Sequence, residues 1–147
     1  MSYRFAIVAS EYNSVIMDRL IEGAKRALKD QKQVRVIRVP GSFEIPLAAQ
    51  HAGESGRFDA IVCLGCLIRG ETAHFEYIAS AVSHGLTEAA AATGVPMAFG
   101  VLTTNSVEEA LARASTGPDN KGHEAAMAAV EMAEIIAQLT RQAAPRS

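Results

Sequence analysis

A short run in the middle of the chain, Gly70-Glu71-Thr72-Ala73-His74, combines residue types that bind anions and move protons. Amides at the start of a helix lack acceptors within the helix and lie at the positive end of its dipole. A phosphate could therefore bind the amides of Glu71 and Thr72, with help from the Thr72 hydroxyl. A plain glycine turn with Thr72 as the N-cap of the helix is the competing interpretation. The Glu71 carboxylate would repel the anion unless it points away.

His74 is the candidate proton carrier, because an imidazole near pH 7 can both donate and accept a proton. A surface or structurally satisfied histidine is the alternative. Glu44, between Phe43 and Ile45, could cap the following helix or accept N–H groups of a ligand. Tyr12 and Phe43 could be core side chains or flat surfaces on which a ring stacks.

Taken alone, the two cysteines and the cations Arg113 and Lys121 are more simply explained as structural residues than as functional ones. Cys63 and Cys66 have the C-x-x-C spacing, but they lie in or just after a predicted strand, whereas a redox pair needs its first thiol at a helix N-terminus. We expect structural thiols in reducing surroundings, and no metal site formed with the 4 scattered histidines. Arg113 and Lys121 flank a polar, turn-rich loop and read alone as solvated surface charges.

Four nearly continuous apolar runs predict the parallel strands that would position these residues. Such runs are typical of strands covered on both faces. They are Arg4–Ala9, Val34–Val39, Ala60–Leu64 and Met97–Leu102. The second run is interrupted by Arg35 and Arg38, which places it nearer an edge of the sheet.

Apolar residues at helical spacing separate and follow these runs. They extend from Ile16 to Leu28, from Phe75 to Leu86 and from Ala125 to Leu139. Helix boundaries are indicated by a capping box at Ser106-Val-Glu-Glu109, by Gly94 with Pro96, and by Pro46 in a first turn.

The alternating pattern predicts a three-layer α/β/α sandwich with a central four-stranded parallel sheet, which is a flavodoxin-like α/β fold. Right-handed crossovers place helices on both faces of such a sheet. We expect residues 1–147 to form one domain. Ligands of open parallel sheets bind outside the carboxyl ends of the strands, so the candidate residues should meet there.

Composition and net charge limit the classes of partner that this protein is expected to bind. The chain has 147 residues, a formal net charge of −2 and 49% hydrophobic residues, as expected of a folded globular protein. The charge gives no reason to expect a nucleic-acid partner or an anionic membrane surface. No apolar run approaches the roughly 20 residues of a membrane span, and the N-terminus lacks signal-peptide features, so a cytoplasmic protein is expected.

Six stretches, taken in order, carry a family resemblance. They are Tyr12-Asn13, Pro40-Gly-Ser-Phe-Glu-Ile-Pro46, Gly65-Cys-Leu-Ile-Arg-Gly-Glu-Thr-Ala-His-Phe-Glu-Tyr-Ile78, Phe99-Gly-Val-Leu-Thr-Thr104, Ala110-Leu-Ala-Arg113 and Asn120-Lys-Gly122. Together they resemble the lumazine synthase family over nearly the whole chain.

The resemblance implies an activity in riboflavin biosynthesis. It is the condensation of 5-amino-6-(D-ribitylamino)uracil with 3,4-dihydroxy-2-butanone 4-phosphate to 6,7-dimethyl-8-ribityllumazine, releasing phosphate and water without a cofactor or metal. His74 would be the proton carrier. The implied substrate-binding residues of the same chain are Tyr12, Ser42, Phe43, Glu44, Cys66, Leu67, Ile68, Glu71 and Thr72.

The resemblance also implies a homo-oligomer. Phe99 and Arg113, with help from Lys121, would reach into the crevice of a neighbouring subunit, Arg113 as a phosphate ligand. Family members are pentamers, some of which form decamers or icosahedral capsids. The alternative function is a non-catalytic homologue that binds lumazine or flavin or forms a shell.

Overall fold

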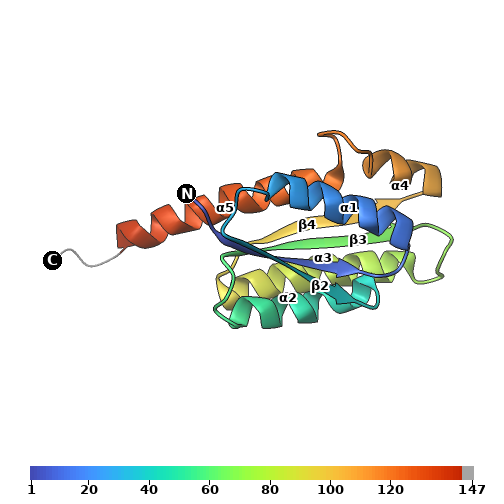
Figure 1. Ribbon diagram of the computed structural model, residues 1–147. Helices are drawn as coiled ribbons and strands as arrows, with labels where there is room; N and C mark the ends of the chain where they lie inside the picture. Colours follow the sequence, from blue (N-terminus) through green and yellow to red (C-terminus); the bar gives the residue numbers. More distant parts are fainter. Residues whose placement is uncertain (144–147) are drawn as a thin grey trace.

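A computed structural model describes residues 1–143 of the chain (Figure 1). Its strands are β1 (Arg4–Ser10), β2 (Gln33–Val39), β3 (Ala60–Ile68) and β4 (Met97–Thr104). Its helices are α1 (Ser14–Ala27), the 3-10 helix η1 (Ser42–Glu44), α2 (Ile45–Glu54), α3 (Phe75–Thr93), α4 (Val107–Arg113) and α5 (Lys121–Ala143). Within this described part of the chain, no helix is long and apolar enough to span a membrane.

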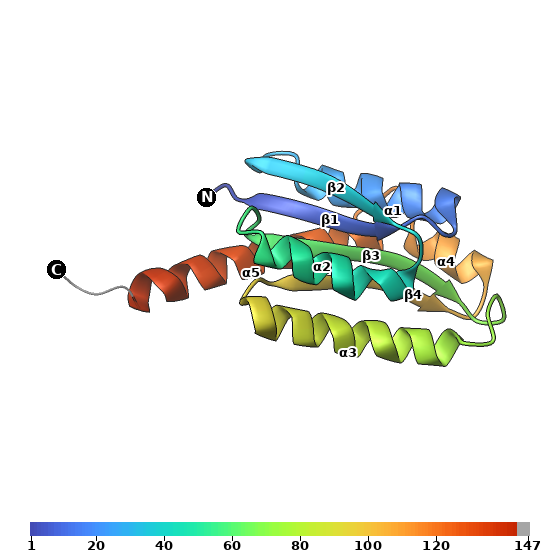
Figure 2. The ribbon, with the colours of Figure 1, turned by 90° about the horizontal axis from the view of Figure 1, so that it is seen from below.

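The four strands form one parallel sheet in the order β2-β1-β3-β4. Helices α1 and α5 cover one face of the sheet, and α2 and α3 cover the other (Figures 1 and 2). The predicted three-layer α/β/α sandwich is confirmed, and so is the edge position of β2. The last four residues of the expected 1–147 domain lie outside the described residues.

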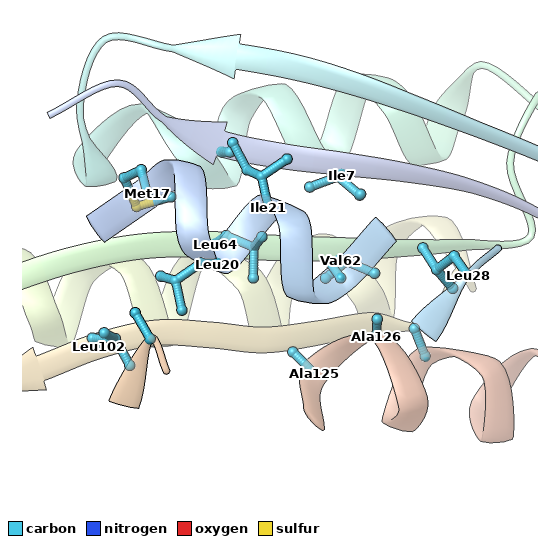
Figure 3. Close-up of a cluster of buried hydrophobic side chains, with 14 of the residues drawn as sticks. Ile7, Met17, Leu20, Ile21, Leu28, Val62, Leu64, Leu102, Ala125 and Ala126 are labelled. Carbon is cyan, nitrogen blue, oxygen red and sulfur yellow. The ribbon is translucent and has the colours of Figure 1, made fainter. Parts of the chain in front are cut away.

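Two hydrophobic cores, one on each face, hold the layers together. Every residue of β3 is buried, because side chains of a central strand point alternately into the two cores. On the α1 and α5 side, Leu64 and Val62 of β3 lie beside Leu20 of α1 (Figure 3). Short alanine side chains of α5 let that helix pack close to the sheet.

The third strand extends four residues beyond its predicted end at Leu64. Gly65 continues the pairing with β4 opposite Val101, and the ladder runs on to Ile68 opposite Thr104. The predicted end of this strand at Leu64 is therefore too early. Glycine is needed at position 65 because the Ser42 hydroxyl lies 2.7 Å from where a Cβ atom would stand, so a larger residue would clash.

The helix boundaries largely follow the sequence signals. Gly94 ends α3 in the left-handed conformation with φ 71, and Pro46 lies in the first turn of α2. The Ser106 hydroxyl caps α4 by accepting the amide of Glu109 at 3.2 Å. The reciprocal half of the capping box differs, since the Glu109 carboxylate accepts the amide of Asn105 at 2.6 Å.

Candidate active site

A cavity of about 290 Å³ opens at the carboxyl ends of β1 and β3, beside η1 and the start of α3. All the residues predicted to bind substrate within one chain line it, which brings together three separate loops. The lining residues are Tyr12, Gly41, Ser42, Phe43, Glu44, Cys66, Leu67, Ile68, Glu71, Thr72 and Ile78. Gly41 and Ile78 were not among the predicted site residues, and their apolar, unreactive types gave no chemical signal.

Two exposed aromatic side chains border the cavity. Tyr12, two residues beyond β1, is 59% exposed, and Phe43 in η1 is 62% exposed. Their exposure excludes the interpretation of these side chains as core residues. The aromatic rings of Tyr12 and Phe43 are both accessible to a flat ligand ring that enters the cavity.

The Glu44 carboxylate is available to a ligand. Glu44 occupies the N-cap position of α2, but its side chain makes no capping hydrogen bond. Its Oε1 atom lies 3.1 Å from where a Cβ of Gly41 would stand, so glycine leaves room for the carboxylate. Of the two interpretations that the sequence left open, capping is excluded, and an acceptor for N–H groups remains.

The turn between β3 and α3 differs from the predicted anion-binding geometry in one amide. Gly70 has a φ of 92, which favours glycine, and the amide of Glu71 donates to the carbonyl of Ile68 at 3.2 Å. The amide of Thr72 has no acceptor among residues 1–143. The helix begins only at Phe75, so Thr72 is not its N-cap, contrary to the alternative drawn from the sequence.

Asn13 determines where the Glu71 carboxylate points. Its side-chain amide donates to Glu71 Oε1 at 3.2 Å and to the carbonyl of Cys66 at 3.3 Å. Asn13 has a φ of 63, a left-handed conformation that asparagine adopts more readily than most residues. Sequence reasoning did not assign Asn13 a role in the site, because its partners lie in β3 and in the turn after it, more than fifty residues away.

His74 lies at the N-cap position of α3, one residue before the helix, and is exposed. Its amide donates to the Thr72 hydroxyl oxygen at 3.1 Å, which keeps the Thr72 hydroxyl proton available to a ligand. The imidazole is not among the groups lining the cavity. It stands at the edge, two residues from Thr72, with its ring 6.4 Å from that of Tyr77.

Phe99, Arg113 and Lys121 line a second cavity of about 350 Å³, between β4, the end of α4 and the start of α5. Helix α5, which borders this cavity, covers one face of the sheet, and α3, which borders the first cavity, covers the other (Figures 1 and 2). Lys121 pairs with Glu124 at 3.0 Å, and Phe99 is 50% exposed. Within one chain, these three residues therefore do not meet the first cavity.

The two cysteines are buried free thiols in β3, on opposite faces of the sheet. Burial raises the pKa of Cys63 to about 12. Burial, with a smaller contribution from the negative charge of Glu71, raises the pKa of Cys66 to about 11. This agrees with structural thiols rather than a redox pair. No cluster of three His, Cys, Asp or Glu side chains suited to a metal occurs in the described part of the chain.

We predict that Cys66 in the folded protein resists alkylation although it lines the first cavity. Only the thiolate reacts, and a pKa of about 11 instead of about 9 leaves roughly 100-fold less thiolate near neutral pH. Labelling with iodoacetamide at pH 7.5, followed by mass spectrometry, measures the rate. Protein unfolded in urea is the control, and equal labelling rates in the two states would contradict the prediction.

Sequence comparisons add independent findings. The model of one protein family, described as 6,7-dimethyl-8-ribityllumazine synthase, matches residues 2–137. A protein of that name from Syntrophus aciditrophicus (strain SB) is 48% identical over 140 residues, which cover 92% of this chain and 91% of the relative. Another of that name from Halorhodospira halophila (strain DSM 244 / SL1) is 46% identical over 140 residues, covering 92% and 90%.

Proposed function

The chain belongs to the 6,7-dimethyl-8-ribityllumazine synthase family, and we propose that it acts through the two cavities described above. It is a transferase of riboflavin biosynthesis that forms 6,7-dimethyl-8-ribityllumazine. The substrates are 5-amino-6-(D-ribitylamino)uracil and 3,4-dihydroxy-2-butanone 4-phosphate. The convergence of three loops on the first cavity carries the assignment of the site, since each loop brings a different kind of contact.

The uracil substrate binds in the first cavity. Its ring stacks on Tyr12, near Phe43, and its polar edge donates N–H groups to the Glu44 carboxylate. Ser42 and the strand segment from Cys66 to Ile68 contact the ring edge and the ribityl chain. The exposure of both aromatic faces and the absence of a capping bond at Glu44 support this placement.

The phosphate group of the second substrate binds at the turn before α3. Thr72, three residues before α3 begins, offers an unused amide and a hydroxyl proton. Because the Glu71 amide already donates to Ile68, we assign it a smaller share than the sequence suggested. The Glu71 carboxylate is held by Asn13.

His74 carries the protons of the reaction. The amine of the uracil attacks the ketone carbon, so a proton must reach the new alkoxide oxygen and another must leave nitrogen. Water leaves as the imine forms, and loss of a proton from carbon then expels phosphate. Ring closure onto the second nitrogen releases the second water. An imidazole beside the phosphate can serve these transfers in turn, and no metal or cofactor is needed.

A direct assay tests the function. Purified protein incubated with both substrates is expected to generate the fluorescence of the lumazine product, together with one inorganic phosphate per turnover. The alternative, a non-catalytic lumazine- or flavin-binding homologue, predicts that added lumazine or flavin binds while neither product accumulates.

The complete site requires two subunits. Phe99, Arg113 and Lys121 face away from the first cavity of their own chain, so we propose that a neighbour supplies them in a homopentamer or an assembly of pentamers. Light scattering coupled to the activity assay is the test, and a fully active monomer would exclude a shared site.

We propose a single domain that works in the cytoplasm, with small-molecule substrates and no nucleic-acid or membrane partner.

We predict that Glu71→Gln lowers the KM for the phosphate substrate. Glutamine keeps the oxygen that accepts from Asn13 but removes a negative charge close to Thr72. For a charge that is largely exposed, the expected gain is about two- to fivefold and should shrink as salt is added. Steady-state kinetics at low and high ionic strength give the comparison. Glu108→Gln on α4 is the matched control, and an unchanged or higher KM for Glu71→Gln would contradict the prediction.

A further inference from the structure

The loop between α4 and α5 carries the two cations of the second cavity at its ends. Arg113 is the last residue of α4, and Lys121 is the first residue of α5. Both side chains line the cavity that we assign to the neighbour's substrate. Their spacing depends on the intervening residues 114–120, which form neither helix nor strand.

Asn120 is fully buried at the end of this loop, and both ends of its side-chain amide are used. Its Nδ2 atom donates to the carbonyl of Ser115 at 2.8 Å, which closes the loop on itself. The same atom donates to the carbonyl of Arg19 in α1 at 3.1 Å. Its Oδ1 atom accepts the amide of His123 at 3.0 Å, which caps α5.

Glycines on both helices make room for this side chain. A Cβ atom on Gly23 of α1 would overlap the Asn120 amide, and a Cβ atom on Gly122 of α5 would overlap the carbonyl of Leu20. The start of α5 therefore packs directly against the backbone of α1. A second hydrogen bond joins α1 to the same loop, since Arg26 of α1 donates to the carbonyl of Thr116 at 3.2 Å.

We infer that Asn120 is a positioning residue that sets the separation of Arg113 and Lys121 by joining the loop to α1. A buried amide with three hydrogen bonds from three segments fits only one arrangement of the loop, because any other arrangement leaves buried polar groups unpaired. The inference rests on the proposed role of Arg113 in binding the neighbour's phosphate substrate. Asn120 itself does not line the cavity.

Asn120→Ser is the main test, because serine still caps α5 but is too short to reach the carbonyls of Ser115 and Arg19. We expect the KM for the phosphate substrate to rise about tenfold, since loss of pre-organisation weakens a charged contact. The KM for the uracil substrate, kcat and the assembled mass should stay within twofold of the parent. Asn105→Ser, in an exposed loop at the other end of α4, is the matched control.

A double-mutant cycle separates positioning from a general structural role. In the Arg113→Ala background, Asn120→Ser should change the KM for the phosphate substrate by less than about twofold, because the separation that Asn120 sets no longer matters once one of the two cations is gone. A tenfold effect in both backgrounds, or equal losses for both substrates, would overturn the inference.

A milder variant covers the case in which Asn120→Ser does not fold. Arg26→Ala removes only the exposed tie to Thr116 and should raise the same KM two- to threefold. An unchanged KM for the phosphate substrate in Arg26→Ala would overturn the inference.

If Arg113→Ala itself leaves the KM for the phosphate substrate unchanged, the proposed phosphate contact fails. If Arg113→Ala raises it and Asn120→Ser does not, only the positioning role fails.

Discussion

Replacing Arg113 with alanine is expected to raise the KM for 3,4-dihydroxy-2-butanone 4-phosphate about 100-fold, with kcat changed less than about threefold. A guanidinium holds a phosphate through two parallel hydrogen bonds, and hydrogen bonds to charged groups contribute about 1.5–3 kcal/mol each. A loss of about 2.8 kcal/mol corresponds to a factor of about 100. Because Arg113 lies on the second cavity, the loss belongs to the neighbour's site.

Steady-state kinetics with each substrate varied in turn measures this effect. Arg113→Lys keeps the charge but loses the planar fork, so an intermediate rise of about tenfold is expected. Arg57→Ala, an exposed arginine before β3 at the opposite end of the sheet, is the matched control and should leave both KM values unchanged. A normal KM in Arg113→Ala would remove the phosphate contact from the proposed site.

His74→Ala is expected to lower kcat about 100-fold while leaving measurable turnover and nearly unchanged KM values. General acid–base catalysis typically contributes about 10²–10⁴-fold, whereas alignment of two reactants can supply an effective molarity of about 10⁵–10⁸ M. The cavity that aligns the reactants does not include the imidazole, so alignment should survive its removal. Water can then move the protons more slowly.

Single-turnover measurements at saturating substrate concentrations report the chemical step without binding effects. His84→Ala, an exposed histidine farther along α3, is the matched control and should retain the parent kcat. A wholly inactive His74→Ala enzyme, together with a nearly normal KM for the phosphate substrate in Arg113→Ala, would reverse the expected order of alignment and proton transfer.

Much of the fold could be predicted from the chain because the signals are local. Continuous apolar runs indicated buried parallel strands, helical spacing indicated the covering helices, and Gly94 and Pro46 marked helix ends through their own backbone preferences. The arginines of the second run indicated an edge strand. The rule that ligands bind at the carboxyl ends of strands then placed the loops of Tyr12, Glu44 and Thr72 at one end of the sheet, where they line one cavity.

One expected strand end and one alternative interpretation were wrong, the first because a partner distant in sequence decides the outcome and the second because a helix starts later than expected. The apolar run from Ala60 to Leu64 indicated that the strand ends there, but pairing with β4 carries the strand to Ile68. A threonine after Gly70 suggested an N-cap, but the helix starts later and Thr72 instead accepts the amide of His74. The low strand propensity of Gly65 matters less to the local structure than the backbone hydrogen bonds that this buried central strand makes with β4.

By itself the sequence determined the order of strands and helices, the residue types available for chemistry and the family to which they belong. Only the tertiary structure decided that Asn13 holds the Glu71 carboxylate, that Asn120 joins the loop to α1, and that Arg113 lines a different cavity from Thr72. The strands and helices could be predicted because backbone propensity and the spacing of apolar residues depend on residues that are close in the chain. The direction of a polar side chain is set by donors and acceptors that meet only after the layers have packed.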